Sequence, residues 1–340
     1  MVISSGRPTM VDVAADAGVS LKTVSRVVNR ISTVDPEMAE RVYESIRKLG
    51  FRRNDVAASL RSGTETRTIG LITADLSNTF YSTLSSAIAA VARERGFHVI
   101  ISSSEENDEL ERSTVLDLCQ RRVSGLIVVP TSSDHSYLRA EVELGIPVVF
   151  VDRPGIGLEA DAILVDNRGG ASDAVAGLIA RAHTRIGLLL DALDIFTMRE
   201  RLAGAQKAME TAGLTFDDDI VSFTSHSPDD AVSALAGMLD LPDPPTAVLC
   251  GNNRSTIGAV EEIWRRSADV EVVGFDDFEM SRLLPQAVTI VDYDTEALGI
   301  ASAERLFDRI AGDTSHPRQV LLPTRLVSRG GRWPVAPKNA

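Results

Sequence analysis

The chain contains few cysteines and no long apolar run. Cys119 and Cys250 are the only cysteines in 340 residues, too few and too far apart for a disulfide framework or a zinc site. No segment approaches the roughly 20 apolar residues of a membrane helix, and the first residues lack the hydrophobic core of a signal peptide. We therefore expect a cytoplasmic protein that holds neither a metal nor a cofactor. Its apolar content of 44% is enough to fill the cores of two or three domains.

Positive charge is also scarce, and its distribution is uneven. The net charge of -13 argues against nucleic acid as a partner, because phosphates repel an acidic protein. Residues 1–67, however, carry 11 Lys and Arg against 8 Asp and Glu, while the remaining 273 residues carry 24 against 40. Contact with a polyanion is therefore expected only in the first segment.

Past residue 68, short apolar runs alternate with amphipathic helical stretches. The runs begin near residues 69, 98, 125, 147, 185, 246, 270 and 288, and each is typical of a buried strand. Alternating strands and helices predict doubly wound parallel sheets with helices on both faces. About ten strands exceed what one compact sheet normally carries, so we expect two α/β subdomains with a ligand pocket in the crevice between them.

The first fifty residues show helical patterns and no strand. Thr9 and Asp12 have the spacing of a capping box, Gly18 is suited to end the first helix, and Ser20 is suited to begin a second. Asp35, followed by proline, predicts a third helix. Helix, tight glycine turn and helix together outline an all-α helix-turn-helix. The alternative is a small helical bundle that docks on the body.

The segment at 12–29, DVAADAGVSLKTVSRVVN, resembles the DNA-reading signature of the LacI/GalR family of bacterial transcription regulators. LGFRRNDVAASLRSG at 49–63 resembles the family's hinge, and IGLITADLSNTFY, GLIVVP, PVVFVDRP, VDNRGG, RERLAG, PTAVLCGNN, VVGFDD and PTRLVSRG follow in family order. The resemblance implies a sequence-specific DNA-binding regulator, expected to be a repressor. Its cleft would bind a small effector such as a sugar, a sugar phosphate or a nucleoside. A homodimer, or a dimer of dimers, would bind near-palindromic double-stranded operator DNA.

The resemblance also implies a domain layout. It places a helix-turn-helix headpiece at 1–50, a hinge helix and linker at 51–67, and an effector-binding and dimerisation core of the periplasmic-binding-protein type at 68–340. Within this core, the N-subdomain would comprise about 68–166 plus 294–322, and the C-subdomain about 167–293 plus 323–340.

The candidate DNA contacts lie on the second helix and in the hinge. Leu21, Lys22 and Arg26 match the family positions that choose bases, and Ser20, Thr23, Ser25 and Asn29 match phosphate or neighbouring contacts. In the hinge, Asn54 would cap a short helix that runs through Ala57 and Leu60, and Leu60 matches the leucine that enters the minor groove. Because so short a helix is only marginally stable in water, we expect it to fold only when it packs against the same helix of the other subunit and against DNA. The alternative is a plain linker.

The candidate effector contacts mostly follow predicted strands, where a cleft ligand would lie. They are Asp75, Phe80, Tyr81, Asp152, Arg153, Thr197, Arg201, His226, Asn252 and Asp276. Carboxylates and guanidinium groups beside an aromatic ring suit sugars and nucleosides. Asn253, Asp191 and Tyr293 depart from common family residues, and Arg153 together with Arg199 leaves an anionic effector open.

Other functions remain as alternatives. The chain lacks the GxxxxGK[ST], GxGxxG, GxSxG and HExxH motifs, so we expect no enzyme. Ser45 and Lys48 form an SxxK pair, expected on the exposed side of the third helix, and acidic residues 217–219, Asp292 and Asp294 are expected at the surface. A transport-type sugar-binding protein would need a secretion signal. An activator or a corepressor-dependent regulator has the same sequence features as a repressor.

Overall fold

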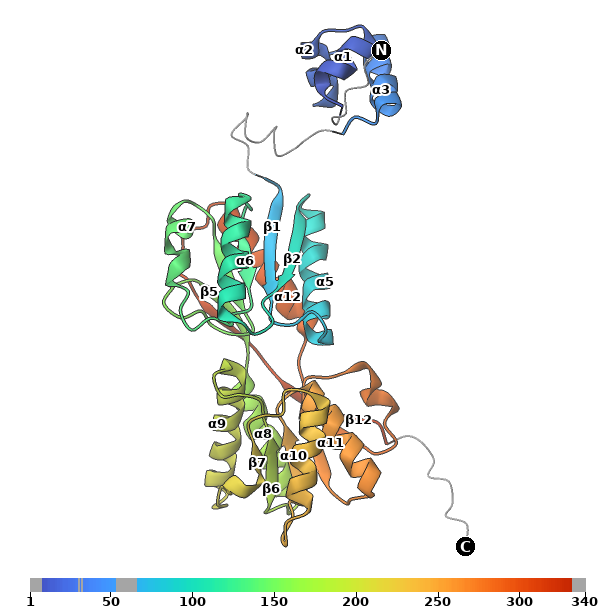
Figure 1. The fold of residues 1–340 in the computed structure, drawn as a ribbon. Helices are drawn as coiled ribbons and strands as arrows, with labels where there is room; N and C mark the ends of the chain where they lie inside the picture. Colours follow the sequence, from blue (N-terminus) through green and yellow to red (C-terminus); the bar gives the residue numbers. More distant parts are fainter. Residues whose placement is uncertain (1–7, 30, 32, 53–65, 332–340) are drawn as a thin grey trace, which may run out of the picture. The chain divides into compact units, whose positions relative to one another are not determined.

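The computed structural model describes residues 8–29, 31, 33–52 and 66–331. The chain divides into two units, Met1–Thr66 and Arg67–Ala340, which are taken separately below (Figure 1). The hinge candidates Asn54, Ala57 and Leu60 lie outside the described residues. In the part of the chain that is described, no helix has the length and apolarity needed to cross a bilayer.

The first unit contains three short helices around an apolar cluster. They are α1 (Met10–Ala17), α2 (Leu21–Val28) and α3 (Pro36–Leu49). The predicted caps are confirmed, because Thr9 and Asp12 form the capping box of α1, Ser20 caps α2 and Asp35 caps α3. The cluster consists mainly of small and β-branched side chains, among them Val13, Ala17, Val24, Val27 and Val42.

The first half of the body, here the N-lobe (residues 67–165 and 294–322), is built on a six-stranded sheet in the order β11-β5-β4-β3-β1-β2. Its strands are β1 (Thr68–Thr73), β2 (His98–Ser103), β3 (Leu126–Val128), β4 (Val148–Val151), β5 (Asp161–Val165) and β11 (Gln319–Leu322). Its helices are α5 (Thr79–Glu94), α6 (Asp108–Gln120), η1 (Ser136–Leu138), α7 (Arg139–Glu143) and α12 (Thr295–Ile310). All of its strand pairs are parallel.

The second half, here the C-lobe (residues 166–293 and 323–331), repeats this plan with the order β12-β10-β9-β8-β6-β7. Its strands are β6 (Ile186–Leu189), β7 (Val221–Ser222), β8 (Ala247–Cys250), β9 (Glu271–Phe275), β10 (Val288–Asp292) and β12 (Arg325–Arg329). Its helices are α8 (Asn167–Ala180), α9 (Phe196–Thr211), η2 (Asp218–Ile220), α10 (Pro228–Leu239), α11 (Asn253–Arg266) and η3 (Glu279–Leu283). The chain passes between the lobes after β5, after β10 and after β11.

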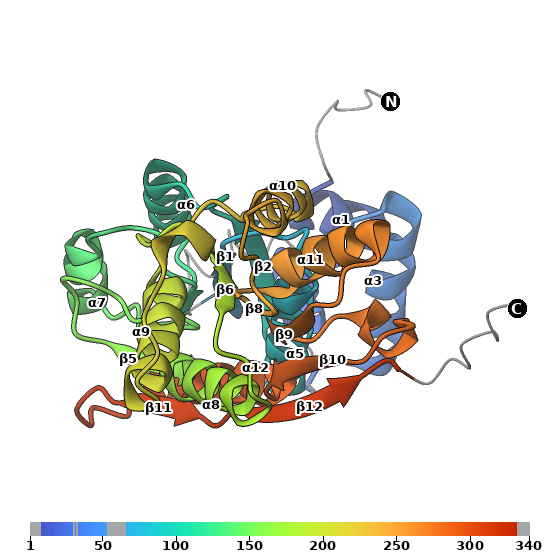
Figure 2. The same ribbon diagram turned by 90° about the horizontal axis from the view of Figure 1, so that it is seen from below.

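Successive residues of each strand point to opposite faces of the sheet, and this alternation gives the C-lobe two apolar layers. Leu188 and Leu249 belong to a cluster with α8 and α9, whereas Leu189 and Val248 belong to a cluster with α10 and α11. Figure 2 shows α8 and α9 side by side, and they are in close contact. The predicted doubly wound α/β body behind a helix-turn-helix headpiece is therefore confirmed.

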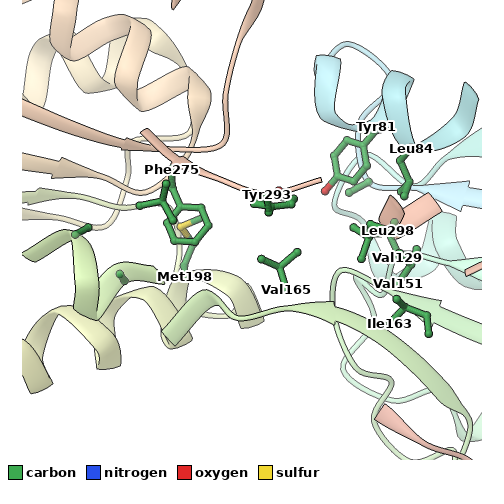
Figure 3. Packing of buried hydrophobic residues seen from close by; sticks show 14 of the residues in the cluster. Tyr81, Leu84, Val129, Val151, Ile163, Val165, Met198, Phe275, Tyr293 and Leu298 are labelled. Atoms are coloured by element: carbon green, nitrogen blue, oxygen red, sulfur yellow. The ribbon is translucent and has the colours of Figure 1, made fainter. Parts of the chain in front are cut away.

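One apolar cluster continues from the N-lobe into the C-lobe. Figure 3 shows Tyr293 between Phe275 and Met198 on the C-lobe side and Tyr81 and Leu84 on the N-lobe side. Tyr293 follows β10, where the chain returns to the N-lobe. The two lobes therefore share buried packing beneath the cleft.

Several sequence expectations are wrong in detail. The run at β2 is not buried, because β2 is an edge strand, and Ile100 and Ile101 are each 39% exposed. The body is not wholly parallel, because β12 pairs with β10 in the antiparallel sense. Ser45 is buried rather than exposed, since its hydroxyl donates to the Val13 carbonyl between α3 and α1. Asp292 is also buried, beneath the guanidinium of Arg325.

Candidate functional site

The turn between α1 and α2 is held by hydrogen bonds. Gly18 ends α1 with a φ of 63°, a left-handed value that glycine adopts without strain. The guanidinium of Arg41, on α3, donates to the carbonyls of Ala17 and Gly18 at 2.5 and 3.3 Å. The Ser20 hydroxyl accepts a hydrogen bond from the Thr23 amide at 3.1 Å and begins α2. These contacts fix the orientation of α2 within its unit.

The outer face of α2 carries the predicted base contacts. Leu21 is 50% exposed, and Lys22 and Arg26 are exposed beside it. Of the predicted phosphate contacts, Ser25 lies on α2 and Asn29 caps its carboxyl end, and the Asn29 side-chain amide donates to the Ser25 hydroxyl at 3.4 Å. An apolar tip with two cations and hydroxyl groups on one short helix suits insertion into a major groove.

One cavity of about 70 Å³ lies between the lobes of the body, and the residues predicted for the effector site all line it. These are Asp75, Phe80, Tyr81, Asp152, Arg153, Thr197, Arg201, His226, Asn252 and Asp276. The sequence did not predict the remaining lining residues, which are Asn78, Glu106, Asp191, Ile195, Met198, Arg254 and Tyr293. Below, this space is called the central cavity.

Arg201 is the most constrained side chain of the central cavity. It is 3% exposed, and its guanidinium lies over the Phe275 ring, 3.6 Å from the ring centre. It donates to Asn167 at 2.8 Å, to the Gly251 carbonyl, and to both carboxylate oxygens of Asp276 at 3.3 Å. This leaves Arg201 in one orientation, facing the cavity from α9.

A close approach of two helices positions Arg201. Gly204 lies one turn further along α9, and a Cβ atom there would be 2.2 Å from the Arg168 carbonyl of α8. Only glycine fits this contact without moving the helices. The α8–α9 packing therefore sets the depth at which Arg201 enters the cavity.

The two lobes place equivalent aspartates at the cavity. Asp152 follows β4 with a φ of 69°, and Asp276 follows β9 with a φ of 68°. Both are left-handed values, which are uncommon outside glycine and occur most often for Asn and Asp. Asp276 also accepts a hydrogen bond from the Tyr293 hydroxyl at 2.7 Å. Each carboxylate is thus held at the carboxyl end of its sheet by a strained turn.

Burial disfavours the charged form of the Asp152 carboxyl group. Burial raises its pKa to about 6, although the nearby guanidinium groups of Arg153 and Arg201 oppose this; the negative charges of Asp276 and Glu106 add to the increase. Its ordinary value is 3.8. The folded body therefore binds this proton more tightly than the unfolded chain, and stability from this group is lost as pH rises from about 4 through about 6.

We expect Asp152→Asn to stabilise the protein at pH 7 by up to about 3 kcal/mol, because two pKa units correspond to about that free energy. Asparagine keeps the shape and tolerates the left-handed backbone. Urea unfolding of both proteins at pH 4, 5, 6 and 7 measures the effect. The free energy of unfolding of the variant should match that of the wild type near pH 4 and should exceed it by a growing amount as the pH rises. A difference that stays constant over this range would contradict the buried charge, and Glu210→Gln, at an exposed carboxylate on α9, is the control.

Arg153 forms the opposite wall. Its guanidinium donates to both carboxylate oxygens of Glu106, at 2.7 and 2.5 Å, and to the Pro130 carbonyl at 3.1 Å. Burial opposes its charge, but Tyr81, Glu106 and Asp152 together raise the pKa of Arg153 above its ordinary value. The group therefore stays positively charged, and it pairs with Glu106 within the N-lobe.

The lobes also meet across the cleft through side chains. Arg254, at the start of α11 in the C-lobe, pairs with Asp75 of the N-lobe at 2.5 Å and donates to the Ser77 hydroxyl at 2.6 Å. Beside this pair, the amides of Asn78 and Asn253 exchange hydrogen bonds at 2.9 and 3.3 Å. These four contacts, here called the latch, hold the loop after β1 against the start of α11.

Two predicted contacts are engaged within the C-lobe. His226 lies 2.8 Å from Asp191, and its side chain is 58% exposed at the cavity mouth. Asn252 caps α11, because its side-chain oxygen accepts a hydrogen bond from the Ser255 amide at 2.8 Å. The side-chain oxygen of Asn252 is therefore used by the helix, although the residue also lines the cavity.

The unpredicted residues could in part have been found by the same rule. Glu106, Asp191 and Tyr293 all follow strands closely, as the predicted aspartates do. Arg254 gave no such signal, because an arginine in the first turn of a helix is ordinarily a surface residue. Its role at the cleft depends on the loop after β1, which is distant in sequence.

The comparisons with known proteins cover nearly the whole chain. The regulator CelR of Thermobifida fusca is 30% identical over 335 residues, which span 95% of this chain and 98% of that protein. The repressor PurR of Proteus mirabilis is 31% identical over 330 residues, spanning 94% and 96%. A crystal structure of the lac repressor dimer bound to operator and the anti-inducer ONPF matches with a TM-score of 0.82 and 30% identity, covering 96% of this chain and 99% of that one.

Two family models match consecutive parts of the chain. Residues 9–54 match the bacterial regulatory proteins of the lacI family, and residues 66–330 match the periplasmic binding proteins and sugar binding domain of the LacI family. The first match contains the exposed face of α2, and the second contains the central cavity and both lobes. The chain therefore belongs to the LacI family and is a DNA-binding transcriptional regulator with an effector-binding domain.

Proposed function

We propose that the body binds a neutral, hydroxyl-rich effector of the sugar class, and that this effector controls operator affinity. The charge balance of the central cavity supports the proposal. Five carboxylates, those of Asp75, Glu106, Asp152, Asp191 and Asp276, line it against three guanidinium groups. Each of these arginines already contacts a carboxylate. The surplus of negative charge disfavours a phosphorylated sugar, while paired charges offer hydrogen bonds to hydroxyl groups.

The headpiece side of the proposal follows from the exposed face of α2. Leu21, Lys22 and Arg26 would read base edges, and Ser20, Thr23, Ser25 and Asn29 would contact or flank the phosphates. In the connecting segment, Asn54, Ala57 and Leu60 would form the hinge helix, with Leu60 in the minor groove. A ligand that changes the relation of the lobes would change the packing available to this segment, and so operator affinity.

We further propose that the protein acts as a homodimeric repressor. Exposed apolar side chains on the body support a self-association surface, namely Ile100 and Ile101 on the edge strand β2 and Met280 and Leu283 on η3. A symmetric dimer presents two copies of α2, which suits a near-palindromic operator.

The test is a thermal-shift screen of the full-length protein against pentoses, hexoses, disaccharides, sugar phosphates and nucleosides. A ligand at 100 times its Kd stabilises the native state by about 2.7 kcal/mol, which such a screen detects. We expect neutral sugars to raise the Tm and sugar phosphates to leave it unchanged. If the largest shift came from a phosphate or a nucleoside, the effector class would be wrong. Operator affinity is then measured with and without the best ligand. A lower affinity in the presence of the ligand identifies the ligand as an inducer.

A further inference from the structure

A second cavity of about 210 Å³ adjoins the central cavity. The two share five lining residues, Glu106, Arg153, Asp191, Ile195 and His226. The shared residues come from both lobes, with Glu106 and Arg153 on one side and Asp191, Ile195 and His226 on the other. The second cavity, here called the outer chamber, is therefore a continuation of the cleft.

The C-lobe wall of the outer chamber combines an aromatic ring with charged groups. Phe196 is partly exposed in the first turn of α9, and the Arg199 guanidinium lies 6.0 Å from its ring centre. Arg199 donates to the carbonyls of Leu193 and Asp194 at 2.8 and 2.7 Å, which fixes its position. An aromatic face beside held donors and acceptors is the surface on which a sugar ring packs.

The N-lobe wall carries hydroxyl groups and one exposed apolar side chain. Thr131 and Ser132 follow β3, and Ile156, which follows β4, is 51% exposed. Ile156 faces the chamber that Phe196 lines from the other lobe. The chamber thus offers apolar contact from both lobes, with polar groups between.

A buried cluster of hydrogen bonds around the Glu111 carboxylate holds this N-lobe wall in place. The Glu111 carboxylate is fully buried and accepts hydrogen bonds from the Thr131 amide at 2.6 Å, the Thr131 hydroxyl at 2.8 Å and the Ser132 amide at 3.1 Å. Burial by itself would raise the pKa of Glu111, but hydrogen bonds from His135 and Thr131 lower it to about 2. The carboxylate is therefore charged at any physiological pH.

The same cluster fixes the loop after β4. His135 is fully buried, and its Nδ1 atom accepts a hydrogen bond from the Ile156 amide at 3.1 Å, while its Nε2 atom lies 3.2 Å from Glu111. Nδ1 is therefore the nitrogen through which the ring holds the loop after β4. Glu111 and His135 together thus hold residues 131, 132 and 156, which are the N-lobe side of the outer chamber. Such support is what a rigid binding wall requires.

We propose that the outer chamber is a second sugar subsite, so that the effector is a disaccharide or a longer oligosaccharide. One ring would lie in the central cavity among Asp152, Arg201 and Asp276, and the next would pack between Phe196 and Ile156. This inference rests on the proposed function, because it assumes that the effector is a sugar. Beyond the proposed function, the second subsite specifies that the ligand has at least two sugar rings and names the residues that select for this length.

The test compares each monosaccharide with its disaccharides on the full-length protein by isothermal titration calorimetry. The panel contains glucose, galactose, mannose and xylose, together with α- and β-linked disaccharides of each. We expect at least one disaccharide to bind tenfold or more tightly than its monosaccharide. Phe196→Ala and Ile156→Ala, on opposite walls, should each reduce that ratio severalfold and leave the monosaccharide affinity within about twofold.

The controls separate the subsite from general effects. Trp264→Ala removes a 72% exposed aromatic side chain of α11, and Leu144→Ala removes an 80% exposed aliphatic side chain that follows α7. Neither lines the chamber, so neither should alter the ratio. A monosaccharide that binds as tightly as every disaccharide, or wall variants that weaken both ligands equally, would overturn the subsite and leave the sugar proposal standing. Tight binding of a nucleoside or a phosphate with no sugar binding would overturn both.

Discussion

Replacing Arg201 by methionine should abolish effector binding and destabilise the protein by about 3–5 kcal/mol. The cost arises because the partly buried carboxylate of Asp276 and the buried amide oxygen of Asn167 each lose a charged donor. Methionine retains apolar contact with the Phe275 ring, so the loss reports mainly on the charge. Urea unfolding measures the stability, and calorimetry with the best ligand of the screen measures the binding.

The same helix supplies the control for Arg201. Lys207 pairs with Glu210 at the surface, where both side chains are more than half exposed, and Lys207→Met should change stability by less than about 0.5 kcal/mol. The double variant Arg201→Met with Asp276→Asn should lose less than the sum of the single changes, because no uncompensated charge remains. Strictly additive losses would show that the two groups do not stabilise each other.

Arg26→Ala should weaken binding to the cognate operator by about 1–3 kcal/mol, roughly 5- to 150-fold, while the body stays folded. The reason is that an exposed arginine on the outer face of α2 is placed to donate two hydrogen bonds to a guanine edge. Selection from random DNA identifies the operator, and fluorescence anisotropy compares affinities for operator and random duplexes. The affinity for the operator should fall, and the affinity for random DNA should stay the same.

Arg47→Ala is the matched change for Arg26. Arg47 lies on α3, its side chain is 66% exposed, and it pairs with Glu40. Removal of this charge should leave the ratio of operator to random affinity unchanged, even if both affinities fall slightly. If Arg26→Ala lowered the two affinities equally, Arg26 would contact phosphate and would not select a base.

The sequence predicted the headpiece in detail because its determinants are local. The capping residues Thr9, Ser20 and Asp35, and the left-handed glycine at 18, each act within a few residues of their own position. The strands of the body could also be predicted, because each is a local apolar run. The exposure of β2 could not be predicted, because it follows from the place of β2 at a sheet edge. The antiparallel β12 depends on pairing with a strand more than thirty residues earlier in the chain.

In the cleft, too, local features could be predicted from the sequence, and contacts between distant residues could not. The positions of Asp75, Asp152 and Asp276 follow from the strands that precede them, because parallel strands end at one edge of a sheet. Which carboxylate pairs with which arginine does not follow, because Asp75 and Arg254 are 179 residues apart and meet only when the lobes come together. For the same reason no sequence pattern indicates that Glu111, on α6, holds the loop after β3.

The latch bridges the two lobes beside the central cavity. When the lobes part, the Asp75–Arg254 pair must break, and this pair is only partly shielded, with 31% and 24% of the two side chains exposed. Dissolved ions screen such a pair and shorten its lifetime, so exchange of the bound molecule should quicken in concentrated electrolyte. The grip of a basic headpiece on phosphates weakens under the same conditions. A rise in ionic strength should therefore act on both units of this regulator, by speeding ligand exchange at the cleft and by weakening the binding of DNA.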